Sequence, residues 1–167
     1  MENKTINEHK NKSSAKINCS IITLSDSRDE SKDLSGDYIE NLIIKRYNLI
    51  SRIIIPDEEK ILEESIEKMI NDKSDVILTT GGTGISKRDI TVECVENLFD
   101  KKLDGFGEIF RHESYLEIGS SALLSRATAG IYKNCCIFSM PGSPNAVKTA
   151  MGIIIDELPH LVHHAKK

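Results

Sequence analysis

The segment GGTGISKRD, residues 81–89, holds the densest group of residues that could do chemistry. It follows the apolar, strand-like run VILTT and places Gly81, Gly82 and Gly84 within four positions. Because glycine lets the backbone approach a ligand closely and adopt positive φ, consecutive N–H groups here can turn toward an anion. The nucleotide-binding fingerprints GxxxxGK[ST] and GxGxxG are both absent. The spacing alone is therefore equally compatible with a phosphate-binding loop and with a tight strand-to-helix turn.

Two aspartates follow different strand-like runs, Asp57 in PDEE and Asp89 in KRDIT. If both runs end at the same edge of a sheet, the two carboxylates can converge. Such a pair suits Mg²⁺, which prefers one or two carboxylates together with substrate phosphates. Each aspartate also has a plainer interpretation, in which Asp57 charges or caps a helix start and Asp89 pairs with Lys87 or Arg88. For either residue in isolation, the plainer interpretation is favoured.

Polar residues in three further segments could bind a small ligand. These segments are SDSRDESKDLSG after the first apolar run, LSRA after a short apolar stretch, and MPGSP. Their candidate binding residues are Ser25, Asp26, Ser27, Arg28, Ser35, Gly36, Ser125, Arg126, Pro141, Gly142 and Ser143. Plainer interpretations exist, since Ser35 can cap the following helix and most arginines placed like Arg126 are solvated. The segment GFGEIFR fits either a hinged ligand loop or a loop-to-helix junction.

Other reactive side chains give weaker indications. HLVHH places His160, His163 and His164 at i, i+3 and i+4, a spacing that suits a metal ion. The C-terminal end of a helix also favours histidine through the helix dipole, and we favour this interpretation. The sequence suggests no Ser–His–Asp or Cys–His pairing, which disfavours covalent catalysis.

The composition is that of an ordinary globular protein of 167 residues, with 39% hydrophobic and 29% charged residues. A net charge of −4 argues against nucleic acid as the main ligand. No apolar run approaches the roughly 20 residues of a membrane span, and the polar N-terminus lacks the apolar core of a signal peptide. We expect a disordered arm over residues 1–16 and one domain over residues 17–167. The four cysteines show no CxxC spacing, which indicates reduced thiols in a cytoplasmic protein.

The apolar patterns alternate between strand-like and helix-like segments. Strands are predicted at 17–25, 49–55, 74–80 and 135–139. Helices are predicted to begin near Ser35, to cover 57–72, 108–118 and 120–126, and to begin at Thr91 and Ser143 as N-caps, with Pro144 in the first turn. This alternation predicts an α/β fold, a Rossmann-like three-layer sandwich with a mostly parallel sheet and helices on both faces. The ligand crevice of such a fold lies beyond the carboxyl ends of the strands, where the four Ser-, Asp-, Gly- and Pro-rich loops would meet.

The order of these motifs resembles a known family. TLSDSRD with SGDYIENLI, PDEE, LTTGGTG with RDIT, GFGEIFR, LSRATAG and MPGSPNAV follow one another as in the MoaB/MogA family of molybdenum-cofactor biosynthesis. The match covers nearly everything from residue 17 to the C-terminus. IFRHESYLEIGSSALLSRATAG and MPGSPNAV resemble the MoaB branch more closely.

The resemblance implies a molybdopterin-binding fold and a molybdopterin adenylyltransferase, which converts molybdopterin and Mg-ATP to adenylyl-molybdopterin and pyrophosphate. It implies that Asp57 and Asp89 are the essential aspartates that hold Mg²⁺. It further implies that the substrates ATP and molybdopterin are bound by the glycine loop and by the serine-rich and MPGSP loops. The glycine loop comprises Gly81, Gly82, Thr83 and Gly84. The family also implies a cytoplasmic homotrimer or homohexamer, and allows contact with other cofactor-biosynthesis proteins.

Two alternatives of different class remain open at this point. Some MoaB-branch members carry a neutral residue near the second aspartate and are suspected to be inactive, so a non-catalytic carrier or scaffold is conceivable, although this chain keeps RDIT. A nucleotide hydrolase on a related domain would be expected to carry a GGxGPTxDD-like loop, which this chain lacks. A dinucleotide oxidoreductase is disfavoured because the glycines do not follow the first strand.

Overall fold

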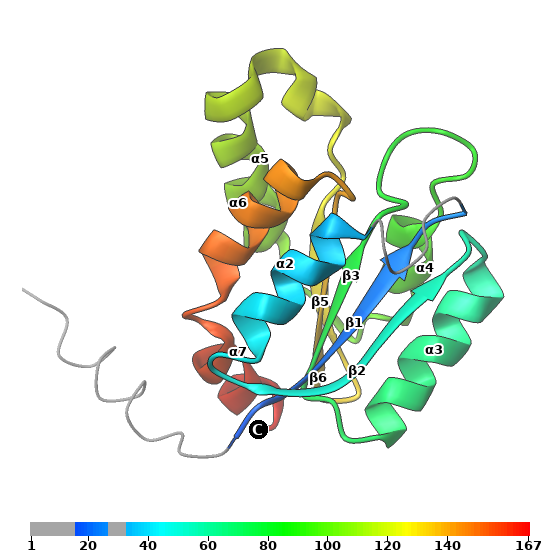
Figure 1. Ribbon diagram of the computed structural model, residues 1–167, viewed down its shortest axis with the longest axis vertical. Helices are drawn as coiled ribbons and strands as arrows, with labels where there is room; N and C mark the ends of the chain where they lie inside the picture. Colours follow the sequence, from blue (N-terminus) through cyan, green and yellow to red (C-terminus); the bar gives the residue numbers. More distant parts are fainter. Residues whose placement is uncertain (1–15, 27–32) are drawn as a thin grey trace, which may run out of the picture.

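The computed structural model describes residues 16–26 and 33–167. A six-stranded mixed sheet in the order β2-β1-β3-β6-β5-β4 forms its centre (Figure 1). The strands are β1 (Asn18–Leu24), β2 (Asn48–Ile55), β3 (Val76–Thr80), β4 (Lys101–Lys102), β5 (Thr128–Tyr132) and β6 (Cys135–Met140). The β1, β2, β3 and β6 strands run parallel, whereas β5 is antiparallel to β6 and β4 is antiparallel to β5. The predicted mostly parallel α/β sheet is therefore confirmed, with an antiparallel edge added.

Helices cover both faces of the sheet, as predicted (Figure 1). The helices are α2 (Leu34–Ile43), α3 (Glu59–Asn71), α4 (Thr91–Leu98), α5 (Asp104–Ile118), α6 (Pro144–Ile154) and α7 (Leu158–Ala165), with the 3₁₀ helix η2 (Gly119–Leu124) after α5. Buried side chains of α2, α5, α6 and α7 share one core with the sheet, and those of α3 and α4 share another. The molecule is thus a three-layer sandwich.

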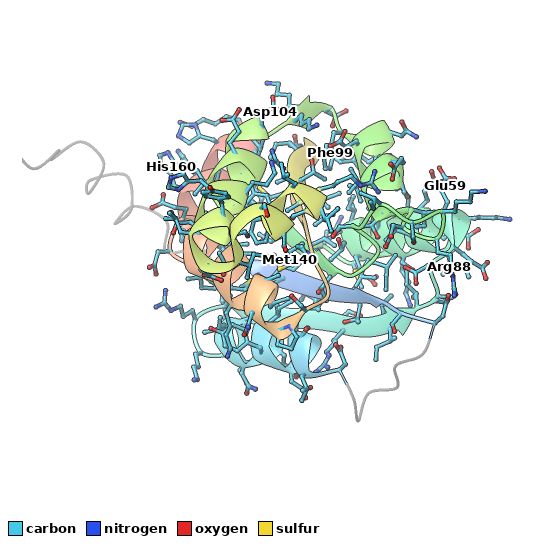
Figure 2. The ribbon with its side chains drawn as sticks, turned by 90° about the horizontal axis from the view of Figure 1, so that it is seen from above. Glu59, Arg88, Phe99, Asp104, Met140 and His160 are labelled. Carbon is cyan, nitrogen blue, oxygen red and sulfur yellow. The ribbon has the colours of Figure 1, made fainter. Side chains whose placement is uncertain are left out.

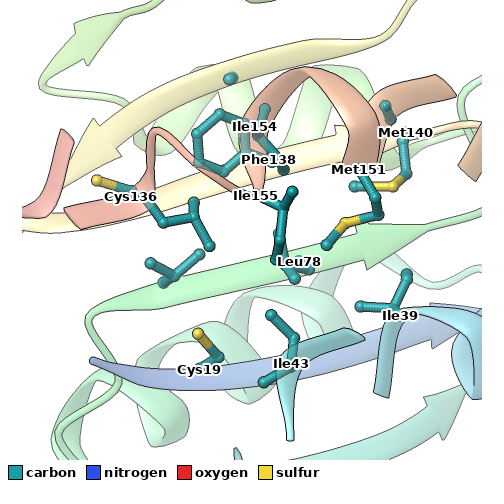
Figure 3. Packing of buried hydrophobic residues seen from close by; sticks show 14 of the residues in the cluster. Cys19, Ile39, Ile43, Leu78, Cys136, Phe138, Met140, Met151, Ile154 and Ile155 are labelled. Carbon is teal, nitrogen blue, oxygen red and sulfur yellow. The ribbon is translucent and has the colours of Figure 1, made fainter. Parts of the chain in front are cut away.

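The central strands β1, β3 and β6 are largely apolar runs because both of their faces are buried. Successive residues of a strand point to opposite faces, so Ile21 joins the core beneath α2 and α6 while Ile22 joins the core beneath α3. Figure 3 shows the larger core, where Leu78 of β3 and Phe138 of β6 lie among apolar residues of the covering helices, including Met151. This packing fixes the strand ends from which the loops of the site emerge.

Helix starts agree with the sequence in part. Ser143 caps α6 by accepting a hydrogen bond from Ala146 N, and Pro144 is in the first turn, as predicted. The prediction that Thr91 caps α4 is wrong, because Thr91 is the first helical residue and its Oγ1 donates to Gly81 O at 2.9 Å. The helix predicted from residue 108 begins at Asp104, so GFGEIFR is helical rather than a loop.

The antiparallel edge was not predicted. The β5 strand follows a short 3₁₀ helix and is only five residues long, and β4 has two exposed lysines. Neither has the alternating or continuous apolar pattern that identifies a strand. The segment predicted as a helix at 120–126 is η2, which ends at Leu124.

A buried ionic network ties the start of α2 to β2. The fully buried carboxylate of Asp33 accepts hydrogen bonds from Gly36 N at 2.9 Å and Thr23 Oγ1 at 2.7 Å. Arg52 Nη2 donates to the same carboxylate at 2.9 Å, and Arg52 Nη1 binds two further carboxylates of α2. Burial alone would raise the pKa of Asp33, but these hydrogen bonds outweigh it and hold the pKa below its usual value of 3.8. The network therefore contributes stability while Asp33 is ionised.

The four cysteines, Cys19, Cys94, Cys135 and Cys136, are all buried and free. Burial raises the pKa of Cys19, Cys94 and Cys136 to about 12 and that of Cys135 further still. They are consequently packing residues rather than nucleophiles. Within the described residues, no helix is long and apolar enough to traverse a bilayer.

Candidate functional site

A cavity of about 670 Å³ opens where the carboxyl ends of β1, β3 and β6 meet. Figure 2 looks from above onto this end of the molecule, with Arg88 and Met140 labelled. The candidate residues that line the cavity are Ser25, Asp26, Asp57, Gly81, Gly82, Thr83, Gly84, Asp89, Ser125, Pro141, Gly142 and Ser143. Ser27 and Arg28 lie outside the described residues. The structure thus brings most of the candidate set to one cavity, although the loops that carry it are far apart in the sequence.

The glycine loop, residues 81–84, needs glycine for reasons of geometry. Gly81 and Gly82 have φ of 101° and 64°, in the left-handed region that other residues rarely adopt. A Cβ at Gly81 would collide with Leu24 O, and one at Gly82 would collide with Thr91 Oγ1 and lie 2.9 Å from Asp57 Oδ1. The loop therefore passes so close to β1, α4 and Asp57 that no side chain fits.

We expect Gly82→Ala to lower the free energy of unfolding by about 1–3 kcal/mol, because positive φ strains alanine and the new methyl group displaces Thr91. Urea denaturation measures this loss. Gly105→Ala is the matched control, since Gly105 lies within α5 and its Cβ would meet nothing within 4 Å. The control should be neutral or more stable by up to about 1 kcal/mol. Equal stability of the two variants would contradict the tight approach of the loop.

Asp57 is held in an unsatisfied state. Its Oδ1 is buried and has no hydrogen-bond partner among the described residues. Burial, and then the negative charge of Asp89, raise the pKa of Asp57 above its usual value of 3.8. The helix-capping interpretation does not apply, because Glu58 occupies the N-cap of α3. A buried carboxylate oxygen without a donor is the feature that a bound cation would satisfy.

Asp89 stands across the glycine loop in a different environment. A Cβ at Gly84 would lie 2.7 Å from Asp89 Oδ2, just as one at Gly82 would lie 2.9 Å from Asp57 Oδ1. The two carboxylates therefore contact the glycine loop at positions two residues apart, Gly82 and Gly84. Ser86 N donates to Asp89 Oδ2 at 2.8 Å. Hydrogen bonds, first from Ser86 and also from the Gly84 backbone, lower the pKa of Asp89 below 3.8. The suggested pairing with Arg88 is not found; Arg88 forms an ion pair with Asp26 instead.

The donor set fits a hard cation that takes its remaining ligands from a substrate. The described residues contain no group of three or more His, Cys, Asp and Glu side chains that could hold a metal ion by themselves. The three histidines of α7, His160, His163 and His164, therefore form no such group either. Two carboxylates of opposite pKa shift, next to the glycine loop, instead suit Mg²⁺ completed by phosphate oxygens.

Three candidate residues do not line the cavity. Ser35 Oγ donates to Gly142 O at 2.8 Å, and Gly36 N donates to Asp33, so both residues support the surrounding loops. Arg126 points to the outer side of the glycine loop, where its Nε donates to Gly84 O at 2.8 Å. Each of these residues is thus bound to other parts of the protein outside this cavity, and Arg126 lines a second, smaller cavity beside it.

One wall of the cavity was not predicted. It is formed by α5 and η2, through Phe110, Ser114, Ile118, Ser121, Ala122 and Leu124. Arg88 was considered only as a partner of Asp89, yet it lines the cavity as well. The only signal for this wall was GFGEIFR as a possible ligand segment, because Phe110 belongs to it. The cavity is thus polar on the side of the strand-end loops and largely apolar on the side of α5 and η2.

Comparisons with known proteins agree on one family. Residues 20–160 match the family described as "Probable molybdopterin binding domain". The chain is 41% identical to molybdenum cofactor biosynthesis protein B of Bacillus subtilis, with 98% of both chains covered, and 44% identical to that of Bacillus cereus, with 94% of this chain and 95% of the relative covered. The crystal structure of tungsten cofactor synthesizing protein MoaB from Pyrococcus furiosus superposes with a TM-score of 0.84 and 41% identity, covering 91% of this chain and 98% of that chain. With this agreement over nearly its whole length, the chain belongs to the MoaB/MogA family of molybdopterin-binding domains, in its MoaB branch.

Proposed function

We propose that this protein is a molybdopterin adenylyltransferase. The observation that carries the proposal is the buried Oδ1 of Asp57, which finds no hydrogen-bond partner in residues 16–26 and 33–167 and lies beside the glycine loop in the same cavity as Asp89. A buried carboxylate oxygen beside this loop is where a cation that carries substrate phosphates would bind. The names of the relatives, which are molybdenum cofactor biosynthesis proteins, support the pterin as substrate.

The reaction joins a terminal phosphate oxygen of molybdopterin to the α-phosphorus of ATP and breaks the bond from that phosphorus to pyrophosphate. The attacking phosphate is already ionised near neutral pH, so positioning and charge neutralisation are required more than a general base. Asp57 and Asp89 would hold Mg²⁺, which supplies positive charge for the phosphate oxygens. Amides of the glycine loop would orient the phosphates, with Arg88 at the rim offsetting added negative charge.

The two sides of the cavity suit the two parts of each substrate. The loops after β1, β3 and β6 present hydroxyl and amide groups from Ser25, Thr83 and Ser143 for polar atoms. The wall formed by α5 and η2 offers Phe110 and Ile118 to a flat heterocycle, which gains free energy by leaving water. This division assigns rings to the apolar wall and phosphates to the glycine loop.

The direct test is an adenylylation assay on the purified protein with molybdopterin and ATP. We expect an AMP-linked pterin and one pyrophosphate for each product molecule, both dependent on Mg²⁺ and both lost with EDTA. Pterin binding without AMP transfer under these conditions would refute the proposal and favour the carrier or scaffold function.

We also propose that the protein forms the homotrimer or homohexamer implied by its family. Large apolar side chains of α5 and η2 are exposed, namely Ile109, Tyr115, Leu116, Ile118, Leu123 and Leu124. Exposed apolar groups gathered on neighbouring elements are typical of contact surfaces. Light scattering after size exclusion should give three or six times the mass of one chain, 18.6 kDa, and a monomeric mass would contradict this. Any contact with other cofactor-biosynthesis proteins would use the surface left free.

A further inference from the structure

Arg126 is bound on both sides of its guanidinium group, by carbonyls of the glycine loop and Asp89 on one side and by α4 on the other. Its Nε donates to Gly84 O at 2.8 Å and to Thr83 O at 3.4 Å, and its Nη2 donates to Asp89 O at 3.4 Å. The other side of the guanidinium forms an ion pair with the Glu93 carboxylate of α4. A planar guanidinium has five N–H donors in a fixed fork, so these partners use most of its capacity.

The positions of these carbonyl groups determine where the neighbouring amides point. In a trans peptide the C=O of one residue and the N–H of the next point in opposite directions. Because Arg126 holds Thr83 O from outside the loop, the Gly84 N–H points away from Arg126, toward the side of the Asp89 carboxylate. The Asp89 carboxylate lies directly against Gly84, since a Cβ there would be 2.7 Å from Asp89 Oδ2. Arg126 therefore acts on both the main chain and, through Gly84, the side chain of Asp89.

Arg126 also connects the loop to the apolar wall. It follows directly after Ser125, and Ser125, Leu124 and Ala122 line the cavity from the end of η2. A displacement of η2 would thus be transmitted to the glycine loop through the Arg126 side chain.

We propose that Arg126 is a positioning residue that locks the glycine loop and Asp89 to the η2 wall, rather than a ligand of a substrate phosphate. Glu93 orients the guanidinium from the opposite side. The inference rests on the proposed adenylylation for its kinetic readout only, since the state of the loop is measured separately.

Two substitutions at Arg126 and one at Glu93 separate the two roles. Arg126→Lys keeps the positive charge but loses the forked guanidinium group. If Arg126 bound a substrate phosphate, lysine would largely preserve activity, whereas it would not if Arg126 positions the loop. We expect Arg126→Lys and Arg126→Gln both to lower kcat by about 10- to 100-fold, as small misplacements of reacting groups do, with KM for ATP changed less than about 3-fold. Glu93→Gln should reproduce a weaker form of the same kcat defect. If Arg126 were a ligand of the substrate, its release from residue 93 in Glu93→Gln would instead leave kcat unchanged or lower KM.

Hydrogen exchange of the amides in residues 84–91 measures the loop without any assay of activity. Arg126→Gln should exchange faster there by about 10-fold or more, since amide protection reports local opening. Arg111→Gln is the matched control, because Arg111 donates to Ala127 O at 3.1 Å on the adjoining residue but does not contact the loop. Its exchange over 84–91 should equal that of the unaltered protein. Unchanged exchange in Arg126→Gln, or full activity in Arg126→Lys, would overturn the proposal, whereas an inactive unaltered protein with the expected exchange pattern would refute adenylylation alone.

Discussion

The Asp57→Asn variant is expected to lose adenylylation by about 100-fold or more and, at the same time, to gain stability at neutral pH. The loss follows from removing one of two charges that would hold the metal ion against the phosphates. Its size is that of other substitutions that remove one group stabilising charge in the transition state. The gain follows from the raised pKa of Asp57, because its ionised form is less favourable in the folded protein than in the unfolded chain. Steady-state assays and urea denaturation in EDTA measure the two effects.

The Asp89→Asn variant is expected to lose activity, as Asp57→Asn does, but to lose stability where Asp57→Asn gains it. The pKa of Asp89 is lowered, chiefly by its hydrogen bonds from Ser86, so its ionised form stabilises the fold above the usual value of 3.8 and asparagine removes this contribution. An asparagine Oδ1 can still accept from Ser86 N, which should keep the loop folded and much of the pterin affinity. Near-normal turnover in either variant would remove the metal-binding function from that aspartate.

The pH profile provides a second measurement of Asp57. Because its pKa lies above 3.8, activity should fall on the acid side as Asp57 takes up a proton, and that limb should shift or vanish in Asp57→Asn. Asp156→Asn is the control, since the Asp156 side chain is 69% exposed and pairs with Arg46 away from the cavity. The control should keep both the activity and the profile of the unaltered protein.

The sequence was most informative where physics leaves few choices. The central parallel strands could be predicted because a strand buried on both faces is largely apolar, and 76–80 and 135–139 fit this requirement. The glycine loop could be predicted for a related reason, since positive φ and the lack of room for a Cβ at Gly81 and Gly82 favour glycine. The order of these loops in the sequence then indicated the family.

The rest depended on directions that no local pattern encodes. Arg126 contacts Gly84 from 42 residues away, and whether it faces the cavity or the outer side of the loop is decided by the path of η2 and β5. The apolar wall was missed for the same reason, because Phe110 and Ile118 look like ordinary core positions of a helix until α5 is placed beside the strand ends. The Thr91 hydroxyl was assigned to a helix cap, yet Thr91 is the first helical residue of α4 and its hydroxyl donates to Gly81 O of the glycine loop.

The Arg52→Met variant is expected to lower the free energy of unfolding by about 3 kcal/mol or more at pH 7. Removing one partner of a buried pair leaves the other charge desolvated, and Asp33 is fully buried while the Arg52 side chain is only 16% exposed. Arg46→Met is the matched control, because the Arg46–Asp156 pair is 49% and 69% exposed and such pairs contribute about 0–1 kcal/mol. Urea denaturation of both variants measures the difference, and equal losses would show that the network at Asp33 has no special weight.

The pH dependence identifies Asp33 as the reason for the loss. In the unaltered protein the lowered pKa of Asp33 gives stability that is fully present above the usual value of 3.8 and disappears as pH falls through the lowered pKa. Without Arg52 the buried carboxyl takes up a proton at higher pH, which relieves the desolvated charge. The stability difference between Arg52→Met and the unaltered protein should therefore narrow as the pH is lowered from 7 toward about 4. A difference that stayed constant over this range would place the loss in packing of the arginine side chain instead of in its charge.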